Sequence, residues 1–580
     1  MNRRLALLLF LLIFLPAFSV SGHDEPKSLV VPEEAQHKHS SHEGHQIVVE
    51  QKVVVPEEAQ HKHSPHEGHQ IVVEQEVEAG RPLGTITMTL FVLTGIAITF
   101  FYTRSYPSRE KKWSFDLLEI PWVKKIVRWK HFQLMLQLPN LVIFAFVIYF
   151  GFYDTQIGGR NFATKITWTI WWAAIIFAFV FVGRLWCAMC PFGALTNWAS
   201  RIFKPMRRFP RSLRSIWLAS LAFILLTWAD VYFGIVSSPS RTAWMVVIIA
   251  TIAIAIGVFY QRATFCRYLC PIGGLIGLYS MVSPFELRAK DSSVCLTCPT
   301  KDCYRGNEKG QGCPVFEFPS AMERNNYCLL CTECVKTCPN DNIAFRRRPF
   351  MQDIWSSSRK FFDEAFLAIM LVGLVFLVTG EMVEPWHEWV DSISYFLPFS
   401  AFGITDHELI EKLTFTVVYF IAIFFLIPFL LWLTSLFSRW IAQPAELSLR
   451  KVFTLFGYMF IPIGLALHLA HNLSHLLKEG PGIAPVIQRT VNKFTPYDLG
   501  NPNWQIGALA SDSDIYYLQM FILVAFYLFS LYLGHRLAMS NYQDKKLAFK
   551  AVFPMVLLSL GFTILNVFLL SQPMLARHSH

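Results

Sequence analysis

The chain alternates long apolar segments with shorter polar ones, and this pattern predicts a membrane protein. About ten segments are apolar over about 20 residues, the length of helix that crosses a ~30 Å hydrocarbon core. The expected spans are 83–102, 133–152, 166–186, 215–235, 243–262, 364–385, 413–437, 452–474, 515–536 and 551–571. The pattern therefore predicts an all-α polytopic membrane bundle of about ten transmembrane helices, surrounded by a lipid bilayer.

The longest break between these segments is polar and rich in cysteine. It follows the fifth segment and runs from Cys266 to Phe362. Its length and polarity predict a soluble module inserted into the bundle. We therefore expect a membrane bundle at 81–290, the module at 291–348, and a second membrane bundle of about five helices at 349–580.

The N-terminus has a different character from the rest of the chain. Residues 1–22 start with a basic pair, continue as an apolar run and end in small residues, the order of a signal peptide or an uncleaved anchor. Residues 23–80 are acidic, interrupted by proline and without apolar periodicity, so we expect a disordered tail outside the cytoplasm. Within the tail, residues 31–45 recur at 55–69 with a period of 24 residues and one replacement.

Each copy of this repeat carries four histidines. They are His37, His39, His42 and His45 in the first copy, and His61, His63, His66 and His69 in the second. Imidazole suits borderline divalent metals, so the tail is predicted to collect metal ions outside the membrane. The alternative interpretation is a solvated or pH-responsive linker.

Composition and charge narrow the class of protein. The chain is 53% hydrophobic and only 16% charged, which excludes a cytosolic globule, a secreted enzyme and a DNA-binding factor. The net charge of +10 is interpreted as a topology signal, because the basic residues gather in alternate loops such as 104–128 and 201–214. This bias predicts a multi-pass protein of the bacterial inner membrane with its tail in the periplasm and its module in the cytoplasm. No nucleic acid partner is expected.

All twelve cysteines lie between Cys187 and Cys338, on the predicted cytoplasmic side, where disulfides are disfavoured. Cys328, Cys331, Cys334 and Cys338 have the spacing of a bacterial ferredoxin run, and Pro339 follows them. A looser run precedes it and ends in a Cys-Pro pair. Since the fourth cysteine of each run ligates the other cluster in two-cluster ferredoxins, we predict two [4Fe–4S] sites. One set is Cys295, Cys298, Cys303 and Cys338, and the other is Cys313, Cys328, Cys331 and Cys334. Structural zinc is the alternative, but zinc sites usually pair two short Cys-x2-Cys knuckles.

The remaining four cysteines lie at the ends of two expected spans. Cys187 and Cys190 precede Pro191, and Cys266 and Cys270 precede Pro271. Each pair follows two spans, which suggests a parallel internal duplication that would bring all four thiols to one membrane depth. A third cluster, a soft-metal site for copper or zinc, and a dithiol redox pair all fit this prediction. The alternative is a packing role at helix ends.

With these motifs, the segment from about 133 to 348 resembles the membrane polyferredoxin family. That family includes the quinol-oxidising partner of periplasmic nitrate reductase, the iron–sulfur flavoprotein that supports nitrous-oxide reductase, and a haem-copper oxidase assembly factor. In members of this family, three residues commonly separate the two cysteines of each membrane pair. Here only two residues separate Cys187 from Cys190. The resemblance implies electron transfer through a cytoplasmic two-cluster module on a bundle that interacts with quinone.

The eighth expected span carries His468, His471 and His475 near its outer end. Their spacing places the three imidazoles on one stripe of a helix, and polar groups at membrane depth are usually functional. A copper, zinc or nickel site suits these ligands, with Glu381, Glu384 and His387 as candidates to complete it. Haem is disfavoured, because His535, the obvious second ligand, is expected near the opposite face. Quinone binding and a simply hydrated helix end are the alternatives.

Three functional hypotheses follow. The first is a membrane iron–sulfur relay between a cytoplasmic or quinol donor and a redox or metal centre near the outer face. The second is a metal reductase or assembly factor, for example for copper, that supplies a periplasmic metalloenzyme. The third is a redox-sensing regulator or transporter. The chain has no motif for ATP, dinucleotide or hydrolase chemistry, so the donor is expected to be the quinone pool or a partner protein, and catalytic residues are not identified.

Overall fold

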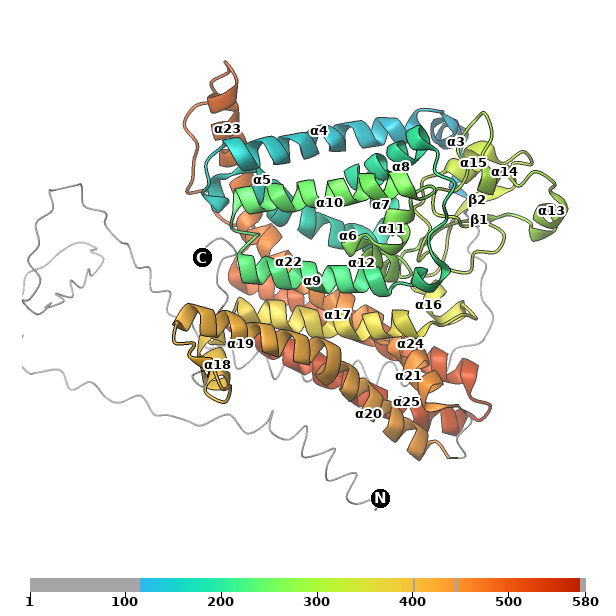
Figure 1. Ribbon diagram of the computed structural model, residues 1–580. Coiled ribbons are helices and arrows are strands. Elements are labelled where there is room, and N and C mark those ends of the chain that lie inside the picture. The colour runs from blue at the N-terminus through green and yellow to red at the C-terminus, as the bar shows by residue number, and fades with distance from the viewer. Residues whose placement is uncertain (1–114, 400–401, 444–446, 574–580) are drawn as a thin grey trace, which may run out of the picture. The chain divides into compact units, whose positions relative to one another are not determined.

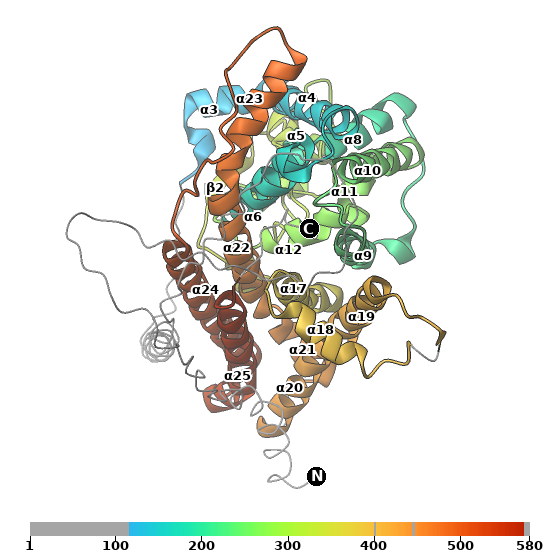
Figure 2. The same cartoon turned by 90° about the vertical axis from the view of Figure 1, so that its left-hand side faces the viewer.

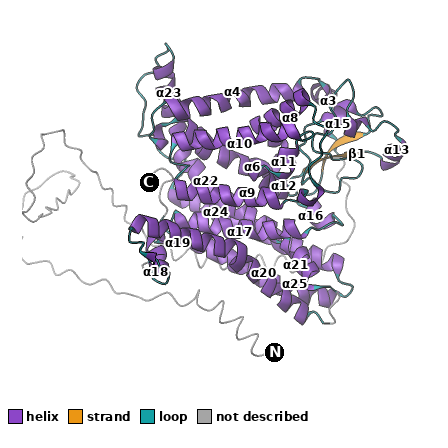
Figure 3. Cartoon of the chain, viewed as in Figure 1, coloured by secondary structure: helices purple, strands orange, loops and turns teal. Residues whose placement is uncertain are grey.

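The computed structural model describes residues 115–399, 402–443 and 447–573. The signal segment, the tail with its eight histidines and the first expected span at 83–102 lie outside the described residues. Long apolar helices make up most of the described part (Figure 1; Figure 3). Each of the nine expected spans in this part coincides with an apolar helix or helix run. Eight of these runs are long and apolar enough to cross a membrane, and the ninth, α9, is shorter.

The N-terminal half contains two similar series of helices. The first series is α4 (Phe132–Tyr153), α5 (Phe162–Thr164), the π-helix η4 (Lys165–Trp171), α6 (Trp172–Val182), α7 (Leu185–Met189) and α8 (Pro191–Phe203). The second is α9 (Trp217–Phe233), α10 (Pro239–Phe259), α11 (Thr264–Tyr268) and α12 (Pro271–Tyr279). Each series ends in a short helix, a cysteine pair and a helix that begins with proline. This order agrees with the duplication suggested by the two Cys-Pro pairs.

A close approach between helices fixes the two series against each other. A Cβ added at Gly257 on α10 would lie 2.4 Å from the carbonyl oxygen of Thr196 on α8. No side chain fits there, so α8 and α10 pack backbone against backbone. Because α8 begins directly after Cys190, this contact helps to hold the first cysteine pair beside the second series.

The module is small and follows the N-terminal half. Strands β1 (Phe285–Ala289) and β2 (Ile343–Arg347) pair antiparallel, with Leu287 opposite Phe345. Between them lie the short helices α13 (Ser292–Thr297), α14 (Asp302–Arg305) and α15 (Glu333–Thr337), and α16 (Gln352–Ser356) follows. This two-stranded sheet with short helices is the α+β composition expected for the module. Its first strand begins six residues before the expected boundary at 291, because a five-residue strand shortly after an apolar helix leaves little periodic signal.

A segment before the first described span also contacts the module. Asp116 forms a bridge with Arg346, and α3 (Pro121–Arg128) packs on α15. Lys124 and Arg128 on α3 both pair with Asp341. The basic residues of α3, interpreted from the sequence as a topology signal, therefore also bind the module.

The C-terminal half wraps around one buried helix. Its elements are α17 (Phe362–Glu381), α18 (Trp386–Ser394), α19 (His407–Ile421), the π-helix η7 (Ala422–Leu426), α20 (Ile427–Ile441), α21 (Leu449–Gly457), α22 (Phe460–Glu479), α23 (Ile483–Phe494), α24 (Asp512–Asn541) and α25 (Lys545–Leu570). Short 3-10 turns lie at Leu117–Glu119, Gly158–Arg160, Arg211–Leu213 and Gly480–Gly482.

Helix α22 packs on α24, α17 and α6 (Figure 2). The most apolar 18-residue window of the run α21–α23 is fully buried, whereas that of α4 is 22% buried. Polar side chains on α22 therefore face protein rather than lipid.

Candidate functional site

The structure brings together each of the two predicted sets of module cysteines. Cys303 lies within electrostatic range of Cys295, Cys298 and Cys338. The side-chain amide of Asn342 donates to Cys295 Sγ at 3.3 Å, while its backbone N–H donates to Cys338 Sγ, also at 3.3 Å. One asparagine therefore links the looser run to the last cysteine of the ferredoxin run, the crosswise pairing expected from the sequence.

The second set gathers around Cys334. This thiol is within electrostatic range of Cys331, Cys328 and Cys313, and also of Cys303 in the first set. The backbone N–H of Glu317 donates to Cys313 Sγ at 3.2 Å. The two sets therefore adjoin each other through Cys303 and Cys334, as a pair of clusters that exchange electrons would require.

The donor chemistry of these sets fits iron–sulfur clusters. Burial and the neighbouring cysteines raise the pKa of Cys303 to about 12, and burial raises the pKa of Cys313 to about 12. Such thiols become thiolates when a metal displaces the proton. Within the described residues, no three His, Cys, Asp or Glu side chains are arranged to hold one metal ion. The thiolates of a cubane each bind a different iron, so a cubane does not need that arrangement.

The four membrane cysteines also meet, at the junction of the two helix series. Cys266 lies within electrostatic range of Cys270, Cys190 and Cys187. A Cβ added at Gly193, on α8, would lie 3.6 Å from Cys266 Sγ in the other series. We call these four residues the membrane tetrad. The repeated Cys-Pro context suggests such a meeting, and the structure places the four side chains near one another. Their role as a redox or metal site stays a prediction.

The three cysteine sets follow one another through shared hydrophobic cores. One core contains Cys303, Cys328 and Cys334, with Cys338 packed against it. A second core contains Cys266, with Cys187, Cys270, Cys313 and Cys331 packed against it. The first core joins the two module sets, and the second joins the nearer module set to the tetrad. The order is thus first set, second set, tetrad.

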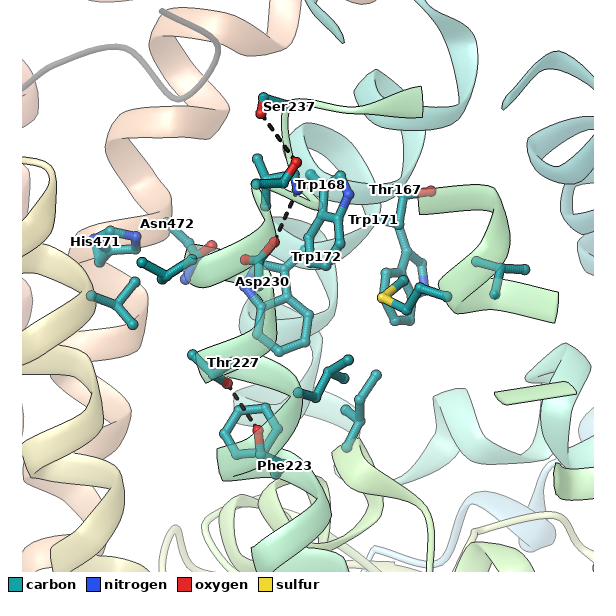
Figure 4. Close-up of a pocket in the computed structure, with 18 of the residues that line it drawn as sticks. Thr167, Trp168, Trp171, Trp172, Phe223, Thr227, Asp230, Ser237, His471 and Asn472 are labelled. Atoms are coloured by element: carbon teal, nitrogen blue, oxygen red, sulfur yellow. Dashed lines mark hydrogen bonds between the residues drawn. The ribbon is translucent and has the colours of Figure 1, made fainter. Parts of the chain in front are cut away.

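Beyond the tetrad lies a cavity of about 610 Å³ between the N-terminal and C-terminal halves. Its walls are mostly apolar and include Trp168, Trp171, Trp172 and Trp186. Cys190, a member of the tetrad, lines the cavity, and so do His468, His471 and Asn472 on α22. Figure 4 shows the tryptophans of η4 and α6 near Asp230, with His471 and Asn472 on the neighbouring helix. Sequence reasoning missed this cavity, because its lining comes from helices far apart in the chain.

Each histidine of the α22 stripe has its own neighbours. Nδ1 of His468 hydrogen bonds with the Tyr279 hydroxyl at 2.8 Å, and Nδ1 of His475 with Glu479 at 2.8 Å. The His471 ring bonds with Thr379 at 3.2 Å, and its centroid is 4.9 Å from that of His475. His387 pairs instead with Glu411, at 2.6 Å. The stripe is thus a buried polar ladder, and its predicted metal role stays a prediction.

Arg184 is a further residue of this site that sequence reasoning missed. Its side chain is 2% exposed and lies among Cys187, Cys266 and Cys270. The sequence shows an arginine at the end of an apolar span, which is the usual position of a topology-setting charge. Only the fold shows that Arg184 is buried.

Comparison with known proteins supports an iron–sulfur assignment. A family model described as a 4Fe-4S binding domain matches the chain twice, at residues 164–210 and 242–290. These two matches contain the two Cys-Pro pairs, which confirms that the segments are related repeats. No solved structure matches the chain.

Three curated relatives match parts of the chain. An uncharacterized protein of Methanocaldococcus jannaschii is 29% identical over 199 residues, which are 33% of this chain and 73% of the relative. YccM of Escherichia coli, whose name assigns it provisionally to electron transport, is 29% identical over 136 residues, 23% of this chain and 35% of the relative. The NirI protein of Paracoccus denitrificans is 26% identical over 205 residues, 30% of this chain and 28% of the relative. The matches to the last two relatives thus cover about a third of each or less.

Proposed function

We propose that this chain, a multi-pass membrane protein of the 4Fe–4S polyferredoxin family, relays single electrons between its module and a quinone in the cavity. The coarser statement, that it is a membrane-associated iron–sulfur electron-transport protein, follows from the family match and the relatives. The finer proposal adds the route and the site of quinone binding. It also places the module in the cytoplasm, following the charge bias of the loops.

The order of the cysteine sets is the observation that carries this proposal. The two module sets adjoin through Cys303 and Cys334, and the nearer set shares a hydrophobic core with the tetrad. Cys190 then lines the cavity. Bound cubanes take up and release one electron at a time. The cysteine sets therefore adjoin one another in series from the module to the cavity.

The cavity suits a quinone in size and chemistry. Its volume of about 610 Å³ is in the usual range for ligand pockets. Its aromatic walls offer stacking surfaces for a quinoid ring. Asn472 Oδ1 has no hydrogen-bond partner within the described structure and lies on α22 at the lining, where it can accept from a quinol hydroxyl. The oxidation of one quinol releases two electrons and two protons, and the electrons leave one after the other.

A second function is favoured by the far end of the cavity. Glu381, Glu411 and His387 line the cavity, and they belong to the last turn of α17, to α19 and to α18. Helix α18 lies at the end of the bundle away from the module (Figure 1). This acidic entrance would attract cations, including copper ions. A metal reductase or assembly factor would take electrons from the same cysteine series and pass them to a cation at this entrance. The hypothesis of a redox-sensing regulator or transporter has no such observation in its favour.

The cavity can be tested by filling it. Ala174 lines the cavity and Ile252 is an exposed residue of α10 that does not, so Ala174→Trp and Ile252→Trp form a matched pair. Anaerobic protein in liposomes would be mixed with a reduced quinone analogue, and cluster reduction followed by absorbance. We expect cluster reduction to slow at least tenfold in Ala174→Trp, with iron content unchanged, and to be normal in Ile252→Trp. Equal rates in both variants would refute the quinone proposal, and cluster oxidation by copper ions in place of quinone would favour the metal reductase.

A further inference from the structure

The charge of Arg184 has no counter-ion among the described residues. Its guanidinium donates to the carbonyl oxygen of Asn326 at 2.5 Å and to that of Cys266 at 3.2 Å. Its Nε has no partner, although the side chain is 2% exposed. Two carbonyl dipoles do not neutralise a full charge, and a buried unpaired cation is strongly unfavourable. An anion must therefore lie beside this side chain in the functional protein.

The membrane tetrad is the nearest source of negative charge. Arg184 lies within electrostatic range of Cys187, Cys266 and Cys270. Neutral thiols would leave the guanidinium uncompensated, whereas thiolates would neutralise it. The buried arginine thus indicates that the tetrad carries net negative charge.

Two helix N-termini point to the same conclusion. Cys190 is the N-cap of α8 and Cys270 is the N-cap of α12, and a proline follows each. Both cysteines lie close to the first turns of these helices: a Cβ added at Gly193 would lie 3.9 Å from Cys190 Cβ, and one added at Gly273 would lie 3.6 Å from Cys270 Sγ. The positive ends of both helices therefore lie beside cysteines of the tetrad. The duplication supplies this arrangement twice, and Arg184 adds a third positive group.

We propose that the membrane tetrad holds a third [4Fe–4S] cluster and that Arg184 is its buried counter-ion. This inference rests on the proposed electron relay and names its third station. Four thiolates around an oxidised cubane leave a net negative charge. A dithiol pair lacks this charge. A two-thiolate copper site would supply negative charge from only half of the tetrad. No three of these side chains surround a single ion in the described structure, whereas a cubane takes one ligand at each corner.

The proposal also assigns a role to the charge of Arg184. One electron enters this cluster from the quinol in the cavity and one leaves toward the second module set, so no bond at the cluster breaks and Arg184 keeps its proton. Reduction adds one negative charge beside the guanidinium. The arginine therefore stabilises the reduced form more than the oxidised form and raises the reduction potential of the third cluster. Arg184 acts as a positioning residue, since it touches the ligands and not the iron.

The first test counts iron and sulfide in anaerobically purified full-length protein. We expect about twelve irons per chain, and about eight in Cys270→Ser, whose two module signals in electron paramagnetic resonance remain. About eight irons in the unchanged protein, with both module signals present, would overturn this inference and leave the relay standing. An absence of iron altogether would overturn both, and copper in the tetrad would overturn the third cluster alone.

The second test measures the potential of the third signal in a redox titration. Arg184→Gln should shift it to lower potential, and Arg184→Lys, which keeps the charge, should restore most of the shift. Arg489→Gln serves as the control, because it removes a largely buried arginine that pairs with Asp154 in another part of the bundle. An unchanged potential in Arg184→Gln would refute the role of the arginine. If Arg184→Gln does not fold, Arg184→Lys decides alone. Loss of the third signal in Arg184→Lys, which keeps the positive charge, would count against the role of charge.

Discussion

The module and the membrane tetrad hold cysteines by different physical means. In the module, the cysteines lie on short helices and the irregular turns between them, where Lys301, Leu330 and Thr332 adopt left-handed backbone conformations, and backbone N–H groups turn toward sulfurs such as those of Cys313 and Cys338. In the membrane, Cys190 and Cys270 stand at the N-caps of regular helices, Cys187 and Cys266 lie in the short helices before them, and a buried arginine lies among the four. Where the chain can fold irregularly, it surrounds thiolates with peptide groups. Where lipid demands regular helices, helix ends and one buried charge replace those groups.

The largest expected effect comes from a substitution in the module. Cys334 is buried and lies at the junction of both module sets. We expect Cys334→Ser to remove its own cluster, disturb the neighbouring set through Cys303, and abolish electron transfer between the cavity and the module. Cys190→Ser, in the tetrad, should leave both module clusters in place. Iron analysis and electron paramagnetic resonance of the two variants measure this difference, and module signals that survive in Cys334→Ser would contradict it.

The next largest effect is expected where the module joins the membrane helices. Glu364 on α17 accepts hydrogen bonds from Arg324, Asn326 and Tyr458, and it is nearly fully buried. Replacing it with leucine leaves Arg324 buried without its partner. We expect a loss of about 3–5 kcal/mol in the free energy of unfolding. Thermal unfolding of the loaded protein in detergent measures it.

The same contact offers a second comparison within that experiment. In the double variant Glu364→Leu with Arg324→Met, no charge is left uncompensated, so most of the stability should return. A double variant as unstable as the single one would show that hydrogen bonds to Asn326 and Tyr458, rather than charge, hold the module in place. Asn326 also accepts from Arg184 through its carbonyl oxygen, so this contact connects the docking surface to the tetrad.

Much of this architecture could be predicted from the sequence. The apolar segments gave the positions of nine helices, because a span is defined by length and composition over many residues. The cysteine spacings predict the two module sets, because each run places three ligands of one cluster close together in the chain and leaves its last cysteine for the other cluster. The repeated Cys-Pro context also predicted that the tetrad would meet. In each case the signal is local or repeated.

The rest of the site depends on contacts that have no local signal. Arg184 has the same sequence context whether its side chain reaches the headgroups or turns inward. The cavity has walls from α6, α9 and α22, and its polar lining residue Asn472 comes from a helix that lies nearly 300 residues after Trp172. The His468–His475 stripe was recognised, but its partners Tyr279 and Thr379 could not be found from helical spacing alone. Tertiary packing, rather than any pattern along the chain, determines these contacts.

A smaller effect is expected at the far end of the bundle, where a buried charge has partners. Asp154 follows α4 and binds Arg489 on α23, and it lies 2.9 Å from Lys493. Burial opposes its ionisation, but the hydrogen bonds from Arg489 and Lys493 outweigh this and lower its pKa. Asp154→Asn should cost about 1–3 kcal/mol at neutral pH. Unlike Arg184, this group should affect stability and leave all cluster potentials unchanged.

The pH dependence of this effect follows from the direction of the shift. A carboxyl whose pKa is lower in the folded state contributes stability above its unfolded pKa of about 4, and that contribution disappears as the pH falls through the folded pKa. The difference between the unchanged protein and Asp154→Asn should therefore be constant near neutral pH and shrink below about pH 4. Denaturation curves at several pH values measure it. A difference that grows on acidification would contradict the assignment.

The smallest effect is expected on the surface of the module. Asp341 pairs with Lys124 at 2.5 Å and with Arg128, and all three side chains are substantially exposed. Pairs of this kind contribute about 0–1 kcal/mol, and salt weakens them. Asp341 also has a positive φ of 49°, a conformation that asparagine tolerates, so Asp341→Asn removes the charge without backbone strain. We expect a loss of less than about 1 kcal/mol that vanishes in high salt, with iron content and potentials unchanged. A larger loss that persists in salt would mean that α3 is held by this pair rather than by apolar packing, and that the module depends on charge as closely as the tetrad does.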